Sequence, residues 1–226
     1  MERLRLLGAA TGAIFALVTI VAFAMTPGPS SAADANVIAY YTEHGDAAIW
    51  QAVLAGFGLI CFVAFAAVFS RWSPAAAPAV LISAAAMAAL YSVALGAWES
   101  LGENFKDSNA FDVTSETSRD AHFLYDVGVG AAHMALFMDA AFVGATTVAL
   151  FTTALPRRRL GVVGIVLTAF FVVDAPLQIF GTAGWTNAVG AVVFVGLLVW
   201  VLVLSIALTA SLRREVVAGS IGAAST

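Results

Sequence analysis

Six apolar stretches, and the side on which their flanking arginines fall, constrain this chain more than any other feature. A membrane-spanning helix needs about 20 apolar residues, and six stretches are long enough: residues 6–25, 47–69, 77–98, 122–154, 160–181 and 188–211. Threading them in alternate directions places eight of the ten Lys and Arg residues on one side, namely Arg3, Arg5, Arg71, Arg157, Arg158, Arg159, Arg213 and Arg214. Short loops rich in Arg remain cytoplasmic, so the sequence predicts a multi-pass protein of the cell membrane with both termini in the cytoplasm.

The composition argues against a soluble globular domain. Of the 226 residues, 62% are hydrophobic and 11% are charged, and the mean hydropathy is +0.96. Soluble domains carry about 25% charged residues. The longest polar segments, residues 26–46 and 99–120, are too short to form separate domains. We therefore expect one membrane domain over residues 1–226, an all-α bundle of six transmembrane helices.

The two polar segments are expected on the outer side of the membrane. A Thr-Pro-Gly-Pro break at residues 26–29 is followed by an amphipathic, tyrosine-containing stretch. Such a stretch predicts a short helix lying at the membrane interface. In the second segment, Thr117 and Asp120 have the spacing of a capping box, which predicts the start of the fourth helix.

The first apolar stretch has two interpretations. As a membrane span it carries Gly8 and Gly12 at a small-xxx-small spacing, which permits close contact with another helix. As a cleaved signal peptide it would have Arg3 and Arg5 as its basic start. The apolar run is long for a signal peptide, so we expect a span.

Ionisable side chains inside the spans are candidate functional residues, because a charge in hydrocarbon is costly. At 1.5 Å per residue, His133 lies about 7 Å and Asp174 about 10 Å below the outer boundary, so a His133–Asp174 pair is geometrically possible. Tyr91 reaches a similar depth, and Gln51 is slightly shallower. We expect these residues to form a polar pocket that is open to the outer side and binds a ligand or a proton. The structural alternative is a hydrogen-bonded pair that locks two helices together.

Asp139 lies near the expected centre of the bilayer, with no obvious partner at its depth. Hydrocarbon surroundings favour the neutral form of a carboxyl group. A protonated Asp139, a contact with a small-residue face and a contact with a second copy of the chain are all consistent with the sequence.

A metal site is a second hypothesis. His122 and Asp126 are four residues apart on one helix face, and Glu99 in the neighbouring outer segment is a candidate third ligand. Zinc accepts such ligands, although the spacing matches no specific metal-binding signature. The structural alternative is that both residues are polar groups at the start of a helix.

Several chemistries are excluded or have no support. The single cysteine, Cys61, excludes an intramolecular disulfide and Cys-x-x-Cys redox chemistry. The only lysine is Lys106, in an outer segment, so a retinal pigment is excluded. His133 has no second histidine at its depth to hold haem, and no phosphate-binding loop or nucleic-acid-binding pattern is present. We expect no cofactor.

Three short motifs carry a resemblance that covers most of the chain: the 26–29 break followed by Asn36-Val37-Ile38-Ala39-Tyr40-Tyr41, the end of the second span at Phe69-Ser70-Arg71-Trp72, and the turn Ala154-Leu155-Pro156-Arg157 running into Leu160-Gly161-Val162-Val163-Gly164. On these motifs the chain resembles a large family of six-span bacterial membrane proteins of actinobacterial type, whose function is uncharacterised. The resemblance implies a six-span fold, and no activity, cofactor or functional residue.

The sequence therefore favours a non-enzymatic membrane protein that binds or transports a small or lipidic ligand through its outer-facing pocket. A membrane-embedded metal-dependent hydrolase built on His122 and Asp126 is the first alternative. An accessory subunit of a larger membrane complex is the second. The expected partners are the lipid bilayer and a small or lipidic ligand, with a homo-oligomer or a larger complex as further options.

Overall fold

The computed structural model describes residues 2–26, 28–29, 34–106, 115–153, 158–180 and 185–223. These residues form six helices: α1 (Glu2–Ala24), α2 (Asp34–Ser70), α3 (Ala77–Phe105), α4 (Ser115–Thr152), α5 (Arg158–Phe180) and α6 (Trp185–Ala223). Each helix contains a stretch long and apolar enough to cross a membrane. The predicted all-α bundle of six spans is confirmed, and the chain is a multi-pass membrane protein.

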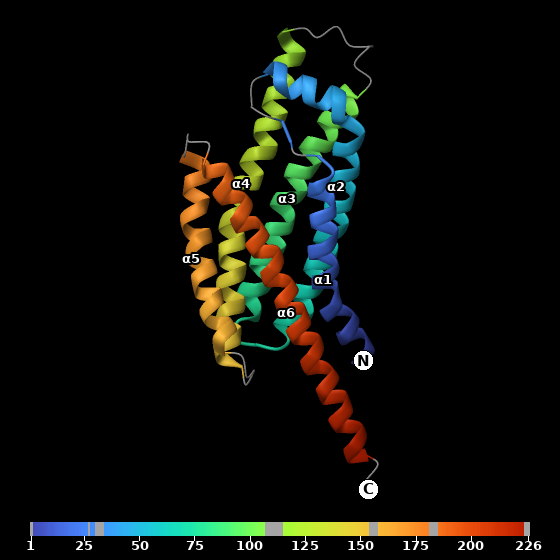
Figure 1. Cartoon of the computed structure of the whole chain (residues 1–226), viewed down its shortest axis with the longest axis vertical. Helices are drawn as coiled ribbons and strands as arrows, with labels where there is room; N and C mark the ends of the chain where they lie inside the picture. Colours follow the sequence, from blue (N-terminus) through green and yellow to red (C-terminus); the bar gives the residue numbers. More distant parts are fainter. Residues whose placement is uncertain are drawn as a thin grey trace.

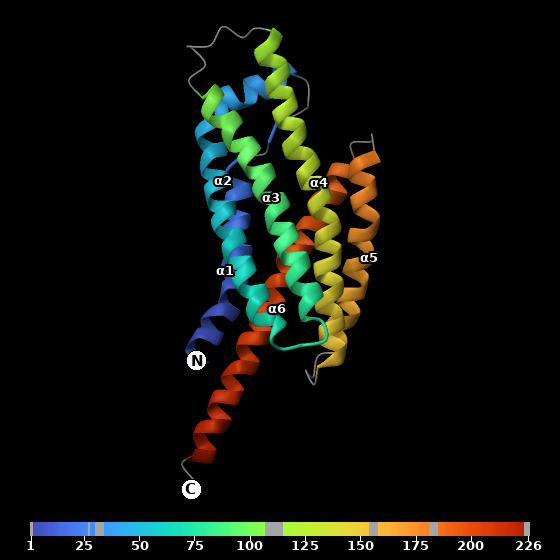
Figure 2. The same ribbon diagram turned by 180° about the vertical axis from the view of Figure 1, so that it is seen from behind.

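Helices that follow one another in the sequence are neighbours in space from α1 to α5. α6 then returns to pack against α1 and, less extensively, against α5. Helix direction alternates, so both termini lie at the same end of the bundle, and α6 extends beyond the other helices there (Figures 1 and 2).

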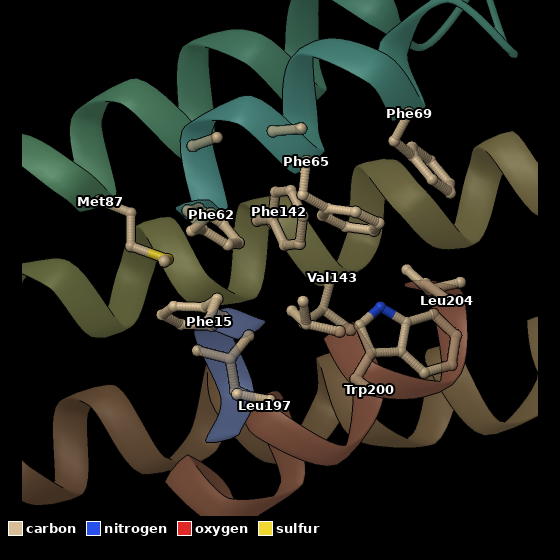
Figure 3. Packing of buried hydrophobic residues seen from close by; sticks show 14 of the residues in the cluster. Phe15, Phe62, Phe65, Phe69, Met87, Phe142, Val143, Leu197, Trp200 and Leu204 are labelled. Atoms are coloured by element: carbon tan, nitrogen blue, oxygen red, sulfur yellow. The ribbon is translucent and has the colours of Figure 1, made fainter. Parts of the chain in front are cut away.

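Aromatic rings fill the centre of the bundle (Figure 3). The ring of Phe62 on α2 packs against Phe15 of α1 and Phe142 of α4, with ring centroids 4.9 and 4.7 Å apart. Trp200 of α6 lies in the same cluster, and its indole N–H donates a hydrogen bond to Thr146 Oγ1 on α4 at 3.0 Å. Side chains from α1, α2, α4 and α6 therefore form one core.

The helices are longer than the predicted spans. α2 begins at Asp34, so the predicted interfacial helix and the second span are parts of one helix, whose first turns lie across the end of the bundle (Figure 1). α3 continues to Phe105 and α4 begins by Ser115. Thr117 therefore lies inside the first turn of α4, and the predicted capping box is wrong. The spacing is also compatible with a helix interior, which is why the pattern misled.

A second apolar cluster joins α2, α3 and α4 at the end of the bundle opposite the termini, and we refer to it as the cap. Its buried members are Val37, Ile38, Tyr41, Ala48, Leu101, Phe105 and Ala121. Two glycines allow the backbones to meet there, since a Cβ atom at Gly45 would lie 2.8 Å from the carbonyl oxygen of Gly102. The amphipathic start of α2 thus packs against protein, where the sequence indicated only a membrane interface.

The N-terminal half of α1 packs closely against α2 and is hydrogen-bonded to one serine of α6. Gly8 and Gly12 both face α2, where a Cβ atom at Gly12 would lie 2.7 Å from Cδ2 of Phe65. The predicted helix contact through these glycines is confirmed. Ser205 of α6 accepts a hydrogen bond from the backbone N–H of Ala13 at 3.1 Å and donates one to the carbonyl oxygen of Ala9 at 2.5 Å.

We expect Gly12→Ala to destabilise the protein, because its new methyl group would collide with the ring of Phe65. Gly56→Ala on α2 is the matched control, since a Cβ atom there meets nothing within 4 Å. Both changes gain helix propensity, about 1 kcal/mol, so only packing distinguishes them. Thermal unfolding in detergent should show a lower midpoint for Gly12→Ala and an unchanged or higher one for Gly56→Ala. Equal midpoints would contradict the packing.

Candidate functional site

A cavity of about 170 Å³ lies inside the bundle, walled by α1, α2, α3, α4 and α6. The α3 wall consists of Tyr91, Leu95 and Trp98, which are four and three residues apart and so share one helix face. From Tyr91 to Trp98 the wall extends about 10 Å along the helix axis at 1.5 Å per residue. The cavity therefore follows α3 for about two turns.

The walls offer hydrocarbon surface to whatever occupies the cavity. Only Thr19, Tyr91 and Trp98 among the lining side chains carry a polar atom. Oγ1 of Thr19 lies against Gly58 on α2, and Nε1 of Trp98 lies against Gly128 on α4. An engineered apolar cavity of about 150 Å³ stays dry and admits benzene. This cavity is thus large enough for a small apolar molecule or part of a hydrocarbon chain.

Tyr91 links the deep end of the cavity to a buried acid. Its hydroxyl donates a hydrogen bond to Oδ2 of Asp139 at 2.9 Å, and Asp139 is completely buried. The expectation that Asp139 has no partner at its depth is therefore wrong. Residue numbering along separate helices gives only a rough depth, and the long tyrosine side chain bridges the difference. The other carboxylate oxygen, Oδ1, has no hydrogen-bond partner among the described residues.

The position of Asp139 on α4 shows how it relates to the cavity. Ala132 lines the cavity, and Asp139 follows it by seven residues, which is about two turns along the same helix face. Asp139 lies toward the α4 C-terminus from Ala132, beyond the part of the wall that Ala132 supplies. Tyr91 both lines the cavity and bonds to Asp139. A change at Asp139 therefore alters a side chain of the cavity wall.

Asp174 is a second completely buried acid, on α5. Its Oδ1 accepts a hydrogen bond at 2.9 Å from Nε2 of Gln178, one turn further along the helix. Its Oδ2 has no hydrogen-bond partner in the described part of the chain. The buried acid on α4 is thus hydrogen-bonded to the cavity-lining Tyr91, and the buried acid on α5 is hydrogen-bonded to Gln178.

The structure brings His133 and Asp174 close enough for an electrostatic interaction. Within the described residues no hydrogen bond or ion pair joins them, and Asp174 bonds to Gln178 instead. His133 is half-buried and follows the cavity-lining Ala132. Gln51 is half-buried one turn before Ala55, which lines the cavity on α2, and so shares its helix face.

The candidate metal ligands are arranged more simply. Nε2 of His122 and Oδ2 of Asp126 are 3.2 Å apart across one turn of α4, and Glu99 is half-buried near the end of α3. No group of three or more His, Cys, Asp or Glu side chains that could hold a metal ion occurs in the described segments. The pair is therefore an ion pair or hydrogen bond at the start of a helix, in the region of the cap.

The sequence reasoning missed most of the cavity wall, including Phe15, Thr19 and Trp98. Trp98 entered the sequence analysis only as the last residue of a predicted span. Its spacing of seven residues from Tyr91, which places both residues on one helix face, is the signal that could have found it. A void leaves no pattern in a sequence, because it depends on how far apart five helices pack. The buried acids were found because a charged residue in an apolar run is conspicuous.

Searches against protein-family models, curated proteins and solved structures found no match to this chain. Any function therefore has to be argued from its own residues and geometry.

We expect Tyr91→Phe to lower stability by about 1–3 kcal/mol, the usual cost of leaving a buried polar group without its partner. Asp139 would then have no hydrogen bond to either oxygen from the described part of the chain. The double variant Tyr91→Phe/Asp139→Leu should recover part of this loss, because replacing both partners by apolar groups is nearly neutral. Thermal unfolding in detergent measures the effect. A single variant as stable as the wild type would contradict the role of this hydrogen bond.

Proposed function

We propose that the protein binds a small apolar or lipidic ligand in the cavity between α1, α2, α3, α4 and α6. The cavity itself carries the proposal. Its wall is apolar, and its deep end is marked by Tyr91 hydrogen-bonded to the buried Asp139. Ligand sites are commonly concave, mostly apolar and furnished with a few fixed polar groups.

The energetic cost of the cavity supports a function. The cavity leaves about 170 Å³ between the helices unfilled by side chains, and unfilled space within a core is destabilising. Larger side chains at Ala55 or Ala132, which line it, would fill the space. Asp139 and Asp174 add a further cost, since each leaves one buried carboxylate oxygen without a partner in the described part of the chain. Retaining both the void and the acids is more easily explained by binding than by stability.

The buried acid beside the cavity gives the proposed site a means of responding to protons. Asp139 accepts a hydrogen bond from Tyr91, which lines the cavity. A proton taken up by Asp139 changes the hydrogen bonding of that wall side chain. We therefore extend the proposal to proton-coupled binding or transport.

The metal-dependent hydrolase is less well supported than the binder. It would need at least a third ligand beside His122 and Asp126, and the described residues supply none. The ion pair or hydrogen bond between the two side chains is sufficient reason for both residues to be there.

A small photoreactive probe tests the proposed function. Phenyl-trifluoromethyl-diazirine is a small apolar probe, a benzene ring that bears a photoreactive trifluoromethyl-diazirine group. Leu197 lines the cavity yet is completely buried, so the probe reaches it only by entering the cavity. After irradiation, mass spectrometry should find label on Leu197 and none on Phe142, which is equally buried but packed in the core. Ile82, a residue that is 69% exposed, is the positive control.

Filling the cavity provides the second half of this test. Ala55→Leu adds volume to the cavity wall and should abolish labelling of Leu197. Ala85→Leu makes the same change at an exposed position on α3 and should leave labelling intact. The proposed function is wrong if Leu197 stays unlabelled in the wild-type protein, or if its label persists in Ala55→Leu.

We further propose that the end of the bundle carrying both termini faces the cytoplasm. The concentration of arginines in the segments at that end supports this orientation. The cap and the Trp98 end of the cavity would then lie toward the outside.

A fusion experiment tests the orientation. Alkaline phosphatase, which folds only outside the cytoplasm, should be active when fused after Lys106, near the end of α3, and inactive when fused to the C-terminus. Green fluorescent protein at the same two positions should give the opposite result. Active phosphatase at the C-terminus would show that the proposed orientation is wrong.

A further inference from the structure

We propose that the occupant of the cavity is a hydrocarbon chain of a membrane lipid, which reaches it sideways from the bilayer between α1 and α6. This inference rests on the proposed function and names its ligand class. Three observations carry it: the place where the cavity meets the surface, the way that place is closed, and the chemistry of the wall.

The cavity meets the surface of the bundle at Phe23 of α1. Phe23 lines the cavity, and the residue is 38% exposed. The surface around it is apolar, since Ile20 and Val21 on α1 and Val195 on α6 are all exposed. One side chain therefore belongs both to the cavity wall and to the apolar outer surface of the bundle.

An aromatic pair closes this place. The ring of Phe23 meets the ring of Phe194 on α6 edge to face, with centroids 5.2 Å apart and an interplanar angle of 66°. Phe194 also lines the cavity. A single aromatic pair is a weak contact, so rotation of the two side chains is enough to separate the rings.

Polar contacts between α1 and α6 lie far from this pair. Ser205 binds the α1 backbone at Ala9 and Ala13. It is eleven residues beyond Phe194, about 16 Å along the helix. In the described residues, no hydrogen bond joins the part of α1 around Phe23 to α6. Among the described residues, α1 and α6 are thus hydrogen-bonded near Ser205 and are in apolar contact alone near Phe23.

The surface that the wall presents to the cavity is apolar, which selects a hydrocarbon over a polar solute. The hydroxyl of Tyr91 is held by Asp139. Thr19 Oγ1 and Trp98 Nε1 are buried against Gly58 and Gly128 and have no hydrogen-bond partner in the described part of the chain. An apolar space that follows α3 for about two turns matches the direction and chemistry of a lipid chain. A polar molecule would lose its hydration against such a wall.

Trp98 makes the proposal testable, because its side chain lines the cavity and fluoresces. We would place single-tryptophan variants, with the other tryptophans changed to Phe, in vesicles of phosphatidylcholine whose chains carry bromine, a contact quencher. A protein that keeps only Trp50, 60% exposed, should be strongly quenched, and one that keeps only Trp200, 3% exposed, should not. We expect Trp98 to be quenched nearly as strongly as Trp50.

Filling the cavity separates a chain inside it from lipid around the bundle. Ala55→Leu should remove most of the quenching of Trp98, whereas Ala85→Leu on the exposed face of α3 should not. If replacing four tryptophans prevents folding, the same comparison is made between the wild-type protein and Trp98→Phe. The quenchable share of emission should then fall in Trp98→Phe.

The outcomes distinguish this inference from the proposed function. If the photoreactive probe labels Leu197 but brominated chains leave Trp98 unquenched, the cavity binds small apolar molecules. The proposal that a lipid chain occupies it is then wrong. If Trp98 is quenched equally with and without Ala55→Leu, the quenching comes from surrounding lipid, and the inference is again overturned. Failure of both the probe and the quencher would remove the proposed function as well.

Discussion

The absence of water inside a bilayer is the constraint on which the rest of this structure depends. Every polar group placed there has to find its partner within the protein. The six helices satisfy their own backbone groups, and a few side chains then connect them. Ser205 hydrogen-bonds to the backbone of α1, and Trp200 hydrogen-bonds to Thr146 across the core. Between lipid-soluble helices such contacts and close packing supply what hydrophobic burial supplies in water.

Against that background, the two buried acids stand out. Asp139 and Asp174 each have one hydrogen bond, from Tyr91 and Gln178 respectively, and each leaves its other oxygen without a partner in the described part of the chain. Asp139 is bonded to Tyr91, which is also part of the cavity wall. Thr19 and Trp98 line the cavity too, and each has a buried polar atom without a hydrogen-bond partner in the described residues. Unsatisfied polar groups and unfilled space therefore occur together at one place in the bundle.

The sequence predicted the helices well and their connections poorly. Hydropathy located all six spans, because the length of an apolar run is set by the thickness of the bilayer. It missed that α2 is continuous from Asp34 and that its first turns belong to the cap. It also assigned a capping box to Thr117, which lies inside α4. Helix ends outside the hydrocarbon are decided by tertiary contacts, such as the meeting of Gly45 with Gly102, and these contacts have no local signature.

Membrane class, span number and the identity of the buried ionisable residues follow from the order of the residues alone, since each is a matter of local apolarity and charge. The partner of Asp139, the second role of Phe23 and the existence of the cavity do not. They depend on how five helices from distant parts of the chain are rotated and spaced. Glycines at close contacts set that spacing, and a difference of one methyl group at such a position changes whether two helices touch or leave a space between them.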